Sequence, residues 1–314
     1  MRYPRGLTWC WLAVLTLAGG CSDEPPPGAG EVFVSIPPQA TFAERIAGDR
    51  ATVTVLLSGG DSPATYSPSM KQMVALDNAV LYFRIGVPFE NALVGKIDTA
   101  DGRPRIVDVT DGIDKRRMKT GHEPHAGDHD HHDHAGAPDP HVWLSPRRVK
   151  TIAANMAEAL IAVDAEHAEY YRRNLRDLQA DLDALDRELS ETFAPVAGQK
   201  MYVYHPAFGY LAEDYGLEQV AVELEGKEPA KKRVAALADR AAREGVRVIF
   251  VQPQFSDRAA RALAEAVEQR RRQQGRPASV AVVALDPLAG DYFANMRRMA
   301  RRIRDALTAP PGGA

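Results

Sequence analysis

Six of the nine histidines of this chain lie in one short segment, and neutral imidazole is a common ligand of transition metals. Aspartate and glycine are their main neighbours, so the segment has no apolar periodicity with which to build a core. The six residues are His122, His125, His129, His131, His132 and His134. We interpret the segment as a metal-collecting loop. A low-affinity sensor and a solvated charge run are the alternatives.

Three further residues have the setting of metal ligands. His205 and Asp286 each follow an apolar, strand-like run and precede a proline, and ligand sites in open parallel sheets form at the carboxyl ends of strands. His141 lies where the His-rich loop gives way to the next helix. A single such residue could be purely structural, as we expect for His167. Two imidazoles and one carboxylate together suit zinc or manganese.

The first 20 residues have the features of a secretory signal peptide. Arg2 and Arg5 precede an apolar run, Leu7–Ala18, that is too short to span a bilayer as a helix. The junction before Cys21 resembles a bacterial lipobox, and residues 21–30 are rich in proline and glycine, as in a tether. We expect a lipoprotein anchored through Cys21 in the bacterial periplasm or at the cell surface. An ordinary cleaved signal peptide is the alternative.

Cysteine content and charge narrow the kinds of site and partner. The second cysteine, Cys10, lies in the predicted signal peptide, so we expect neither an internal disulfide nor a thiolate metal site. The formal net charge is -3, and loss of Arg2 and Arg5 with the signal peptide would make it -5. A net negative charge argues against nucleic acid as a partner.

The elements that must position these residues follow an α/β pattern. Short runs rich in valine and isoleucine alternate with amphipathic segments, which predicts mostly parallel sheets covered by helices. The predicted strands are Glu31–Ile36, Ala51–Leu57, Ile106–Val109, Lys200–Tyr204, Gln219–Val222, Val246–Val251 and Val280–Leu285. The predicted helices are Gln39–Ala47, Pro68–Phe83, Pro146–Val163, Phe208–Tyr215, Pro229–Glu244, Asp257–Gln273 and Asp291–Leu307.

One long helix separates the two α/β blocks. Apolar residues recur at steps of three and four from Tyr171 to Leu189, with charged residues between them. This pattern predicts a helix that lies along its own domains, with a dimeric coiled coil as the alternative, so we expect a monomer. The predicted organisation is a signal peptide (1–20), a tether (21–30), an N-terminal lobe (31–145) with the His-rich loop (119–138), a helical region (146–195), a C-terminal lobe (196–309) and a tail (310–314).

Several motifs occur in a fixed order. They are Pro-Ala-Thr-Tyr-Ser-Pro (63–68), Leu-Tyr-Phe-Arg-Ile-Gly-Val-Pro-Phe-Glu (81–90), Asp-Pro-His-Val-Trp-Leu-Ser-Pro (139–146), Tyr-His-Pro-Ala-Phe-Gly-Tyr-Leu (204–211), Glu-Gly-Lys-Glu-Pro (225–229) and Leu-Asp-Pro-Leu (285–288). With the His-rich loop, this order resembles the zinc/manganese ABC-transporter substrate-binding proteins, the ZnuA- or TroA-like family. The resemblance implies two (β/α) lobes joined by a long rigid helix, with a metal in the inter-lobe cleft. It also implies delivery of the metal to an ABC permease and its ATPase.

The resemblance carries three ligands onto this chain. It places the second and third histidine ligands of the family on His141 and His205, and the acidic ligand on Asp286. The first histidine does not carry over, because Ala64 and Ser67 stand where family members typically read Pro-His-x-Tyr-Glu-Pro. Three protein ligands leave a tetrahedral ion with one open position, which water or a loop histidine could fill. We expect Zn²⁺ as the bound ion, with Mn²⁺ or Fe²⁺ as alternatives.

Two other classes of function compete with metal transport. A zinc ion with an open position could activate water for hydrolysis, with Glu223, Glu225 or Glu228 as the base. The sequence has no His-Glu-x-x-His, Gly-x-Ser-x-Gly or phosphate-loop motif, so we expect no enzyme. A metal-binding adhesin or chaperone on the same fold is the third possibility.

Overall fold

The computed structural model describes residues 28–57, 60–97, 102–118, 136–223 and 230–309. The predicted signal peptide, Cys21, most of the tether, the tail and the six loop histidines lie outside these ranges. Glu225 and Glu228, two of the three bases considered for a hydrolase, also lie outside them.

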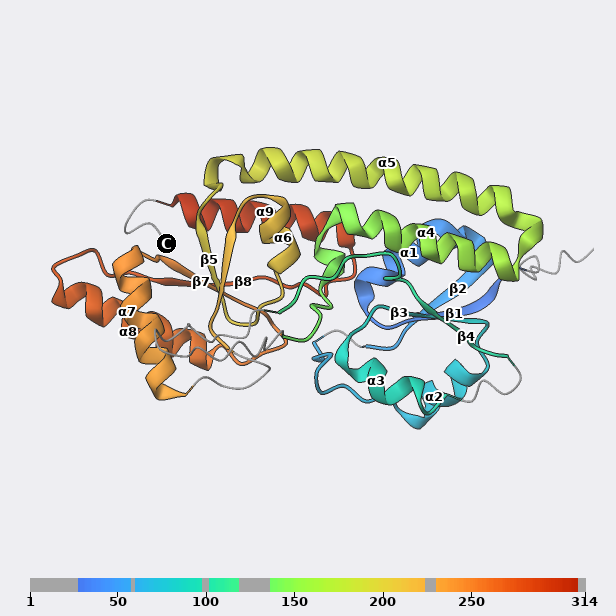
Figure 1. Ribbon diagram of the computed structural model, residues 1–314, viewed down its shortest axis with the longest axis horizontal. Helices are drawn as coiled ribbons and strands as arrows, with labels where there is room; N and C mark the ends of the chain where they lie inside the picture. Colours follow the sequence, from blue (N-terminus) through green and yellow to red (C-terminus); the bar gives the residue numbers. More distant parts are fainter. Residues whose placement is uncertain (1–27, 58–59, 98–101, 119–135, 224–229, 310–314) are drawn as a thin grey trace, which may run out of the picture.

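Two four-stranded sheets form the centres of two lobes (Figure 1). The N-terminal sheet has the order β2-β1-β3-β4 and the C-terminal sheet the order β6-β5-β7-β8, and every neighbouring pair is parallel. The strands are β1 (Gly30–Val34), β2 (Ala51–Val55), β3 (Leu81–Arg84), β4 (Arg105–Asp108), β5 (Lys200–Val203), β6 (Glu218–Ala221), β7 (Val248–Val251) and β8 (Ala281–Ala284). The predicted α/β class with two lobes is confirmed.

Helices cover both sheets and connect the lobes (Figure 1). The N-terminal strands are joined by α1 (Pro37–Ala47), α2 (Met70–Asp77) and α3 (Pro88–Val94), and α4 (Pro146–Val163) leads to the long helix α5 (Ala168–Phe193). The C-terminal lobe contains α6 (Gly209–Asp214), α7 (Lys231–Glu244), α8 (Arg258–Gln273) and α9 (Tyr292–Thr308).

Helix α5 runs along both lobes (Figure 1). Its 26 residues give a length of about 39 Å, since an α-helix rises about 1.5 Å per residue. It packs on α1 and α4 at one end and on α9 at the other. Its buried stripe consists of Tyr171, Leu178, Leu182, Leu185, Leu189 and Phe193. The predicted long helix is therefore present, and its apolar face is covered by its own chain.

The predicted helix Pro68–Phe83 is wrong in its second half. Helix α2 ends at Asp77, and β3 begins at Leu81. Leu81, Tyr82 and Phe83 are fully buried between β1 and β4. The run from Val74 to Phe83 is apolar apart from Asp77 and Asn78, so periodicity alone did not reveal the change from a half-exposed helix to a buried strand. The sequence analysis also missed helix α3.

A buried carboxyl group closes the carboxyl edge of the N-terminal sheet. Glu90 is 1% exposed and accepts hydrogen bonds from Ser35 Oγ (2.5 Å), Ile85 N (2.9 Å) and Gly86 N (2.7 Å). Burial, which disfavours the charged form, raises the pKa of Glu90 above its ordinary value although these donors oppose the shift. Tyr82 joins the network through its hydroxyl, 2.8 Å from Ser35 Oγ.

Side-chain contacts join the lobes close to the predicted ligands. Trp143 is buried and donates from Nε1 to the carbonyl oxygen of Pro287 at 2.8 Å. Arg148, in the first turn of α4, binds Asp214 of α6 at 2.7 Å. These contacts hold the segments around His141 and Asp286 against each other.

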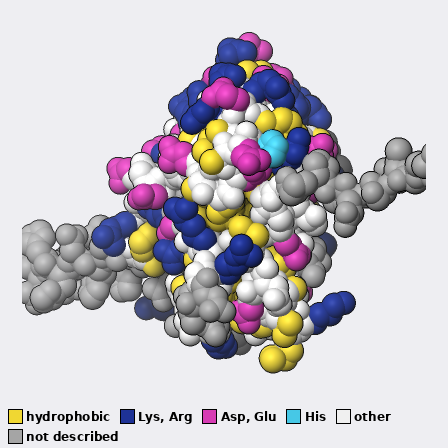
Figure 2. Space-filling view, turned by 90° about the vertical axis from the view of Figure 1, so that its right-hand side faces the viewer, with side chains coloured by type: hydrophobic (Ala, Val, Ile, Leu, Met, Phe, Trp, Pro, Cys, Tyr) yellow, Lys and Arg dark blue, Asp and Glu magenta, His cyan; other side chains and the backbone are white. Residues whose placement is uncertain are grey.

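On the face that Figure 2 shows, at the end of the molecule formed by the N-terminal lobe, basic and acidic side chains of the described residues are intermixed. Within the described ranges, no helix combines the length and the apolar character needed to cross a bilayer.

Truncation of the buried face of α5 should destabilise the whole protein. Leu185 is fully buried, so we expect Leu185→Ala to lower the free energy of unfolding by about 2–5 kcal/mol through lost apolar contacts and the cavity left behind. Arg176→Ala, at an exposed position of the same helix, is the control. Chemical denaturation measures both, and equal stabilities would contradict the packing role of α5.

Candidate metal centre

His141 and His205 come from different lobes and meet with their Nε2 atoms 3.3 Å apart. His141 precedes the 3₁₀ turn Val142–Leu144, which leads into α4, and His205 follows β5. The side chain of His141 is 10% exposed and that of His205 is 18% exposed. The structure therefore brings together two of the three predicted ligands.

A buried carboxylate holds the other nitrogen of each ring. Nδ1 of His141 is 2.7 Å from Asp139 Oδ1, and Nδ1 of His205 is 2.5 Å from Glu223 Oε1. An ionised carboxylate only accepts hydrogen bonds, so each Nδ1 carries the proton and donates it. In the neutral rings both Nε2 atoms then face each other with bare lone pairs. Such a carboxylate–histidine pair is typical of metal-binding imidazoles.

The separation of the two Nε2 atoms matches two ligands of one tetrahedral zinc ion. Zn–N bonds of about 2.0–2.1 Å at a tetrahedral angle place the nitrogens roughly 3.3–3.4 Å apart. Two lone pairs at this distance repel each other unless a cation lies between them. Burial is the main cause that lowers the pKa of His205 below its ordinary value, although Glu223 acts in the opposite direction. The donor set therefore fits a metal ion better than a shared proton.

The parallel register of the C-terminal sheet explains how His205 and Glu223 meet. Val203 of β5 pairs with Ala221 of β6, and each of the two side chains follows two residues later. The backbone continues the pairing, because Glu223 N donates to Tyr204 O at 3.0 Å. Two strand ends thus place an imidazole and a carboxylate side by side although they are 18 residues apart in sequence.

Backbone pairing between residues 116–118 and 137–139 positions Asp139 beside His141. Asp139 N donates to Arg116 O at 2.8 Å, and Tyr210 Oη donates to Asp139 O at 2.9 Å. Asp139 Oδ1 also accepts from the backbone N of His141 at 3.1 Å. Gly209 allows this packing, because a Cβ there would lie 1.9 Å from Nη1 of Arg116.

Asp286 follows β8, at the strand end where the sequence placed it. Its Oδ1 accepts hydrogen bonds from Gln254 Nε2 at 2.8 Å and from Leu288 N at 2.9 Å. Within the residues described, no three His, Cys, Asp or Glu side chains are grouped closely enough to hold a metal ion. The role of Asp286 as a third ligand therefore stays a prediction.

Ala64 lies in an exposed turn and offers no side-chain donor. Its N–H donates to Ser62 Oγ at 3.3 Å, and Phe89 N donates to Pro63 O at 3.2 Å. Tyr66, two residues later, packs edge-on against Phe89 at 4.9 Å between ring centroids. The segment that carries a histidine in the family motif is thus well anchored here, but it carries no histidine.

Sequence reasoning missed most of the residues that orient the ligands. Asp139 was noticed only as part of a motif, and Glu223 only as a possible base. Gln252 binds the backbone of His205 at both N (3.2 Å) and O (2.8 Å), and Phe255 stacks on its ring at 4.8 Å. One feature of the sequence could have indicated Glu223 and Gln252: each lies just beyond a strand that pairs with β5.

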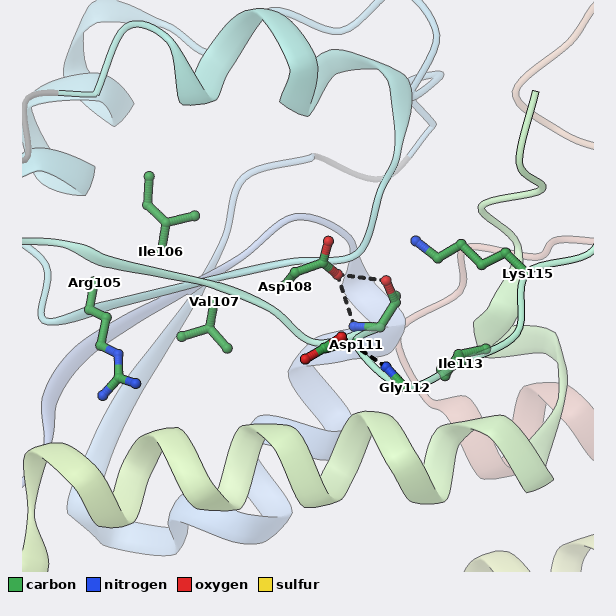
Figure 3. Close-up of a pocket in the computed structure, with 9 residues that line it drawn as sticks. Arg105, Ile106, Val107, Asp108, Asp111, Gly112, Ile113 and Lys115 are labelled. Carbon is green, nitrogen blue, oxygen red and sulfur yellow. Dashed lines mark hydrogen bonds between the residues drawn. The ribbon is translucent and has the colours of Figure 1, made fainter.

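A polar hollow of about 470 Å³ lies elsewhere, at the end of β4 (Figure 3). It is lined by residues 105–108, 110–113 and 115 and contains none of the predicted ligands. Burial alone would raise the pKa of Asp108, but hydrogen bonds from Thr110, with Lys115 and Arg84 nearby, hold that pKa below its ordinary value. Nearby cations therefore already balance the negative charge of Asp108. The histidine pair remains the better candidate for a metal centre.

The family model described as "ZnuA: Zinc-uptake complex component A periplasmic" matches residues 32–306. The chain belongs to this family. The match spans both sheets and includes the histidine pair.

Known proteins similar to this chain support the assignment. A protein of Treponema pallidum (strain Nichols) named as metal-binding is 28% identical over 263 residues, which are 81% of this chain and 83% of that protein. The zinc-binding lipoprotein AdcA of Streptococcus pneumoniae (serotype 4, strain ATCC BAA-334 / TIGR4) is 29% identical over 81% of this chain, and the match spans 50% of AdcA. A crystal structure of ZnuA aligns with a TM-score of 0.77 at 33% identity, covering 89% of this chain and all of that one.

Removal of the carboxylate behind His205 should weaken metal binding. We expect Glu223→Ala to lower zinc affinity by about 10–100-fold, because the ring then loses the acceptor that fixes its tautomer and orientation. Glu218 is exposed at the start of β6, the strand that Glu223 follows, so Glu218→Ala should bind zinc as the wild type does. Competition titration with a chromophoric chelator measures the three affinities. An unchanged affinity of Glu223→Ala would contradict the positioning role.

Zinc affinity should fall as the pH falls. Protons compete with the ion for Nε2, and the lowered pKa of His205 keeps that ring neutral until the pH is below the ordinary imidazole value of about 6.5. We therefore expect full affinity at neutral pH and a steep loss only on further acidification. Competition titrations at a series of pH values test this, and an affinity that does not weaken on acidification would contradict imidazole ligands.

Proposed function

We propose that this chain is the extracytoplasmic metal-binding component of an ABC importer, which captures zinc where its two lobes meet and delivers it to a membrane permease. One observation carries the proposal: two largely buried imidazoles from different lobes have their Nε2 atoms 3.3 Å apart. Membership of the ZnuA family and similarity to the zinc-binding lipoprotein AdcA support it.

The proposed ligands are His141, His205 and Asp286, with Zn²⁺ as the cargo. Two imidazoles favour zinc, although the same ligand set also accepts Mn²⁺ or Fe²⁺. Because Ala64 supplies no donor, another oxygen or nitrogen must complete the coordination. The loop histidines His122–His134 are proposed as auxiliary ligands that gather the ion at lower affinity.

The ion can be released by lobe movement, because its proposed ligands lie on segments of different lobes. His141 belongs to the segment that leads into α4, whereas His205 and Asp286 follow strands of the C-terminal sheet. A permease that moves one lobe relative to the other separates these donors and lowers the affinity. Cys21 would hold the protein at the membrane through a lipid anchor, as a monomer.

Transport is favoured over hydrolysis by the position of Glu223. A catalytic base must face the metal-bound water, but Glu223 Oε1 accepts the hydrogen bond from Nδ1 of His205, on the side of the ring away from Nε2. Its carboxylate orients a ligand and cannot at the same time activate a water. We therefore propose a binding protein and no enzyme.

Calorimetry with chelator-treated protein tests the proposal. We expect one zinc ion bound with micromolar or better affinity. His205→Ala and Asp286→Ala should lose most of it, because each removes a ligand, and both should be more damaging than deletion of residues 122–134. His167→Ala, a histidine paired with Asp164 on the surface, is the matched control.

No zinc binding by the wild-type protein at neutral pH would overturn the proposed function. Equal damage from the loop deletion and from His205→Ala would instead identify a loop histidine as an essential ligand.

A further inference from the structure

One turn after β7 contacts two of the three proposed ligands. Gln252 binds the backbone of His205, and Phe255 stacks on its ring with an interplanar angle of 26°. Gln254, between them, binds the side chain of Asp286 at 2.8 Å. The strand register explains this, because Phe250 pairs with Val203 of β5 and Val251 pairs with Ala284 of β8. The turn 252–255 therefore lies between the two ligand-bearing strand ends.

Two donors converge on one oxygen of Asp286. Gln254 Nε2 and Leu288 N both donate to Oδ1, at 2.8 and 2.9 Å. A carboxylate oxygen that already accepts two hydrogen bonds is a poorer metal ligand than its neighbour. Asp286 is thereby prepared to bind a cation through Oδ2 alone.

The orientation of the Gln254 amide is fixed by this contact. An ionised carboxylate accepts hydrogen bonds and cannot donate them, so the NH₂ group, and not the carbonyl oxygen, makes the hydrogen bond to Asp286. That carbonyl oxygen, Oε1, is buried and has no hydrogen-bond partner among the described residues. A buried amide oxygen without a donor is destabilising, and a bound cation would satisfy it.

We propose that Gln254 holds the cargo ion together with Asp286: its Nε2 keeps Asp286 a one-oxygen ligand, and its Oε1 is the oxygen donor that replaces the family histidine absent at Ala64. The inference rests on the proposed function, because it concerns the same ion. A carbonyl oxygen is a harder donor than imidazole and suits manganese better. This site should therefore discriminate less strongly between zinc and manganese than one with three imidazoles.

Two substitutions separate the roles of the amide. Gln254→Met keeps the length of the side chain but removes both the donor and the oxygen. Gln254→Glu keeps an oxygen for the ion but loses the hydrogen bond to Asp286. Gln273→Met, at the exposed end of α8, is the control.

The readouts are the affinities for Zn²⁺ and Mn²⁺ and the visible absorption of bound Co²⁺, whose band positions and intensities report the donor atoms and their number. The thermal stability of the metal-free variants shows whether the fold is kept. We expect Gln254→Met to bind zinc about 10–100-fold more weakly, with changed Co²⁺ bands. Gln254→Glu should retain most of the affinity, and the control should match the wild type.

Each other outcome has a definite meaning. If both Gln254 variants lose affinity equally, or if the Co²⁺ bands of Gln254→Met are those of the wild type, Oε1 is not a donor and the inference is overturned. If neither variant changes affinity, the link to Asp286 fails as well. If the wild type itself binds no metal, the proposed function fails, and this result is distinct from the other two.

Discussion

The centre of this protein depends on the tautomers of two histidines. Asp139 and Glu223 are almost fully buried, and each accepts a hydrogen bond from Nδ1 of one imidazole. The two Nε2 atoms then carry no proton and face each other as acceptors. A protein interior rarely tolerates such an arrangement, because two unshared lone pairs at short range repel each other. A divalent cation converts the repulsion into two coordinate bonds. Burial supports this outcome, since it disfavours protonation of His205.

Contacts outside the site keep these two rings close together. Helix α5 spans both lobes and buries one face against α1, α4 and α9, which limits how far the sheets can move apart. Trp143 and Arg148 join the lobes close to the site itself. The C-terminal sheet contributes most of the polar residues, because His205, Glu223 and Gln252 all lie two residues beyond paired positions in three adjacent parallel strands.

Much of this arrangement was accessible from sequence. The alternation of Val- and Ile-rich runs with amphipathic segments predicted two α/β lobes, and the strand-end positions of His205 and Asp286 predicted where these side chains would lie. The limits were physical: apolar residues lie on both sides of Asp77 and Asn78, so periodicity alone did not separate the end of α2 from the start of β3. The pairing of His205 with Glu223 depends on the register between β5 and β6, which no local pattern encodes. The position of Gln254 Oε1, which has no hydrogen-bond partner among the described residues, depends on that tertiary geometry too.

The two sheets share one strand order, so each has one topological switch point. In each sheet the strand order reverses beside the first strand, and such topological switch points usually open a crevice. In the C-terminal lobe, His205 and Gln252 follow the two strands, β5 and β7, on either side of that point. In the N-terminal lobe the equivalent place is filled by the chain's own Glu90, which occupies the backbone amides of Ile85 and Gly86 and the hydroxyl of Ser35. The N-terminal sheet thus fills its own switch point with Glu90, whereas the C-terminal sheet has the imidazole of His205 at the corresponding strand end.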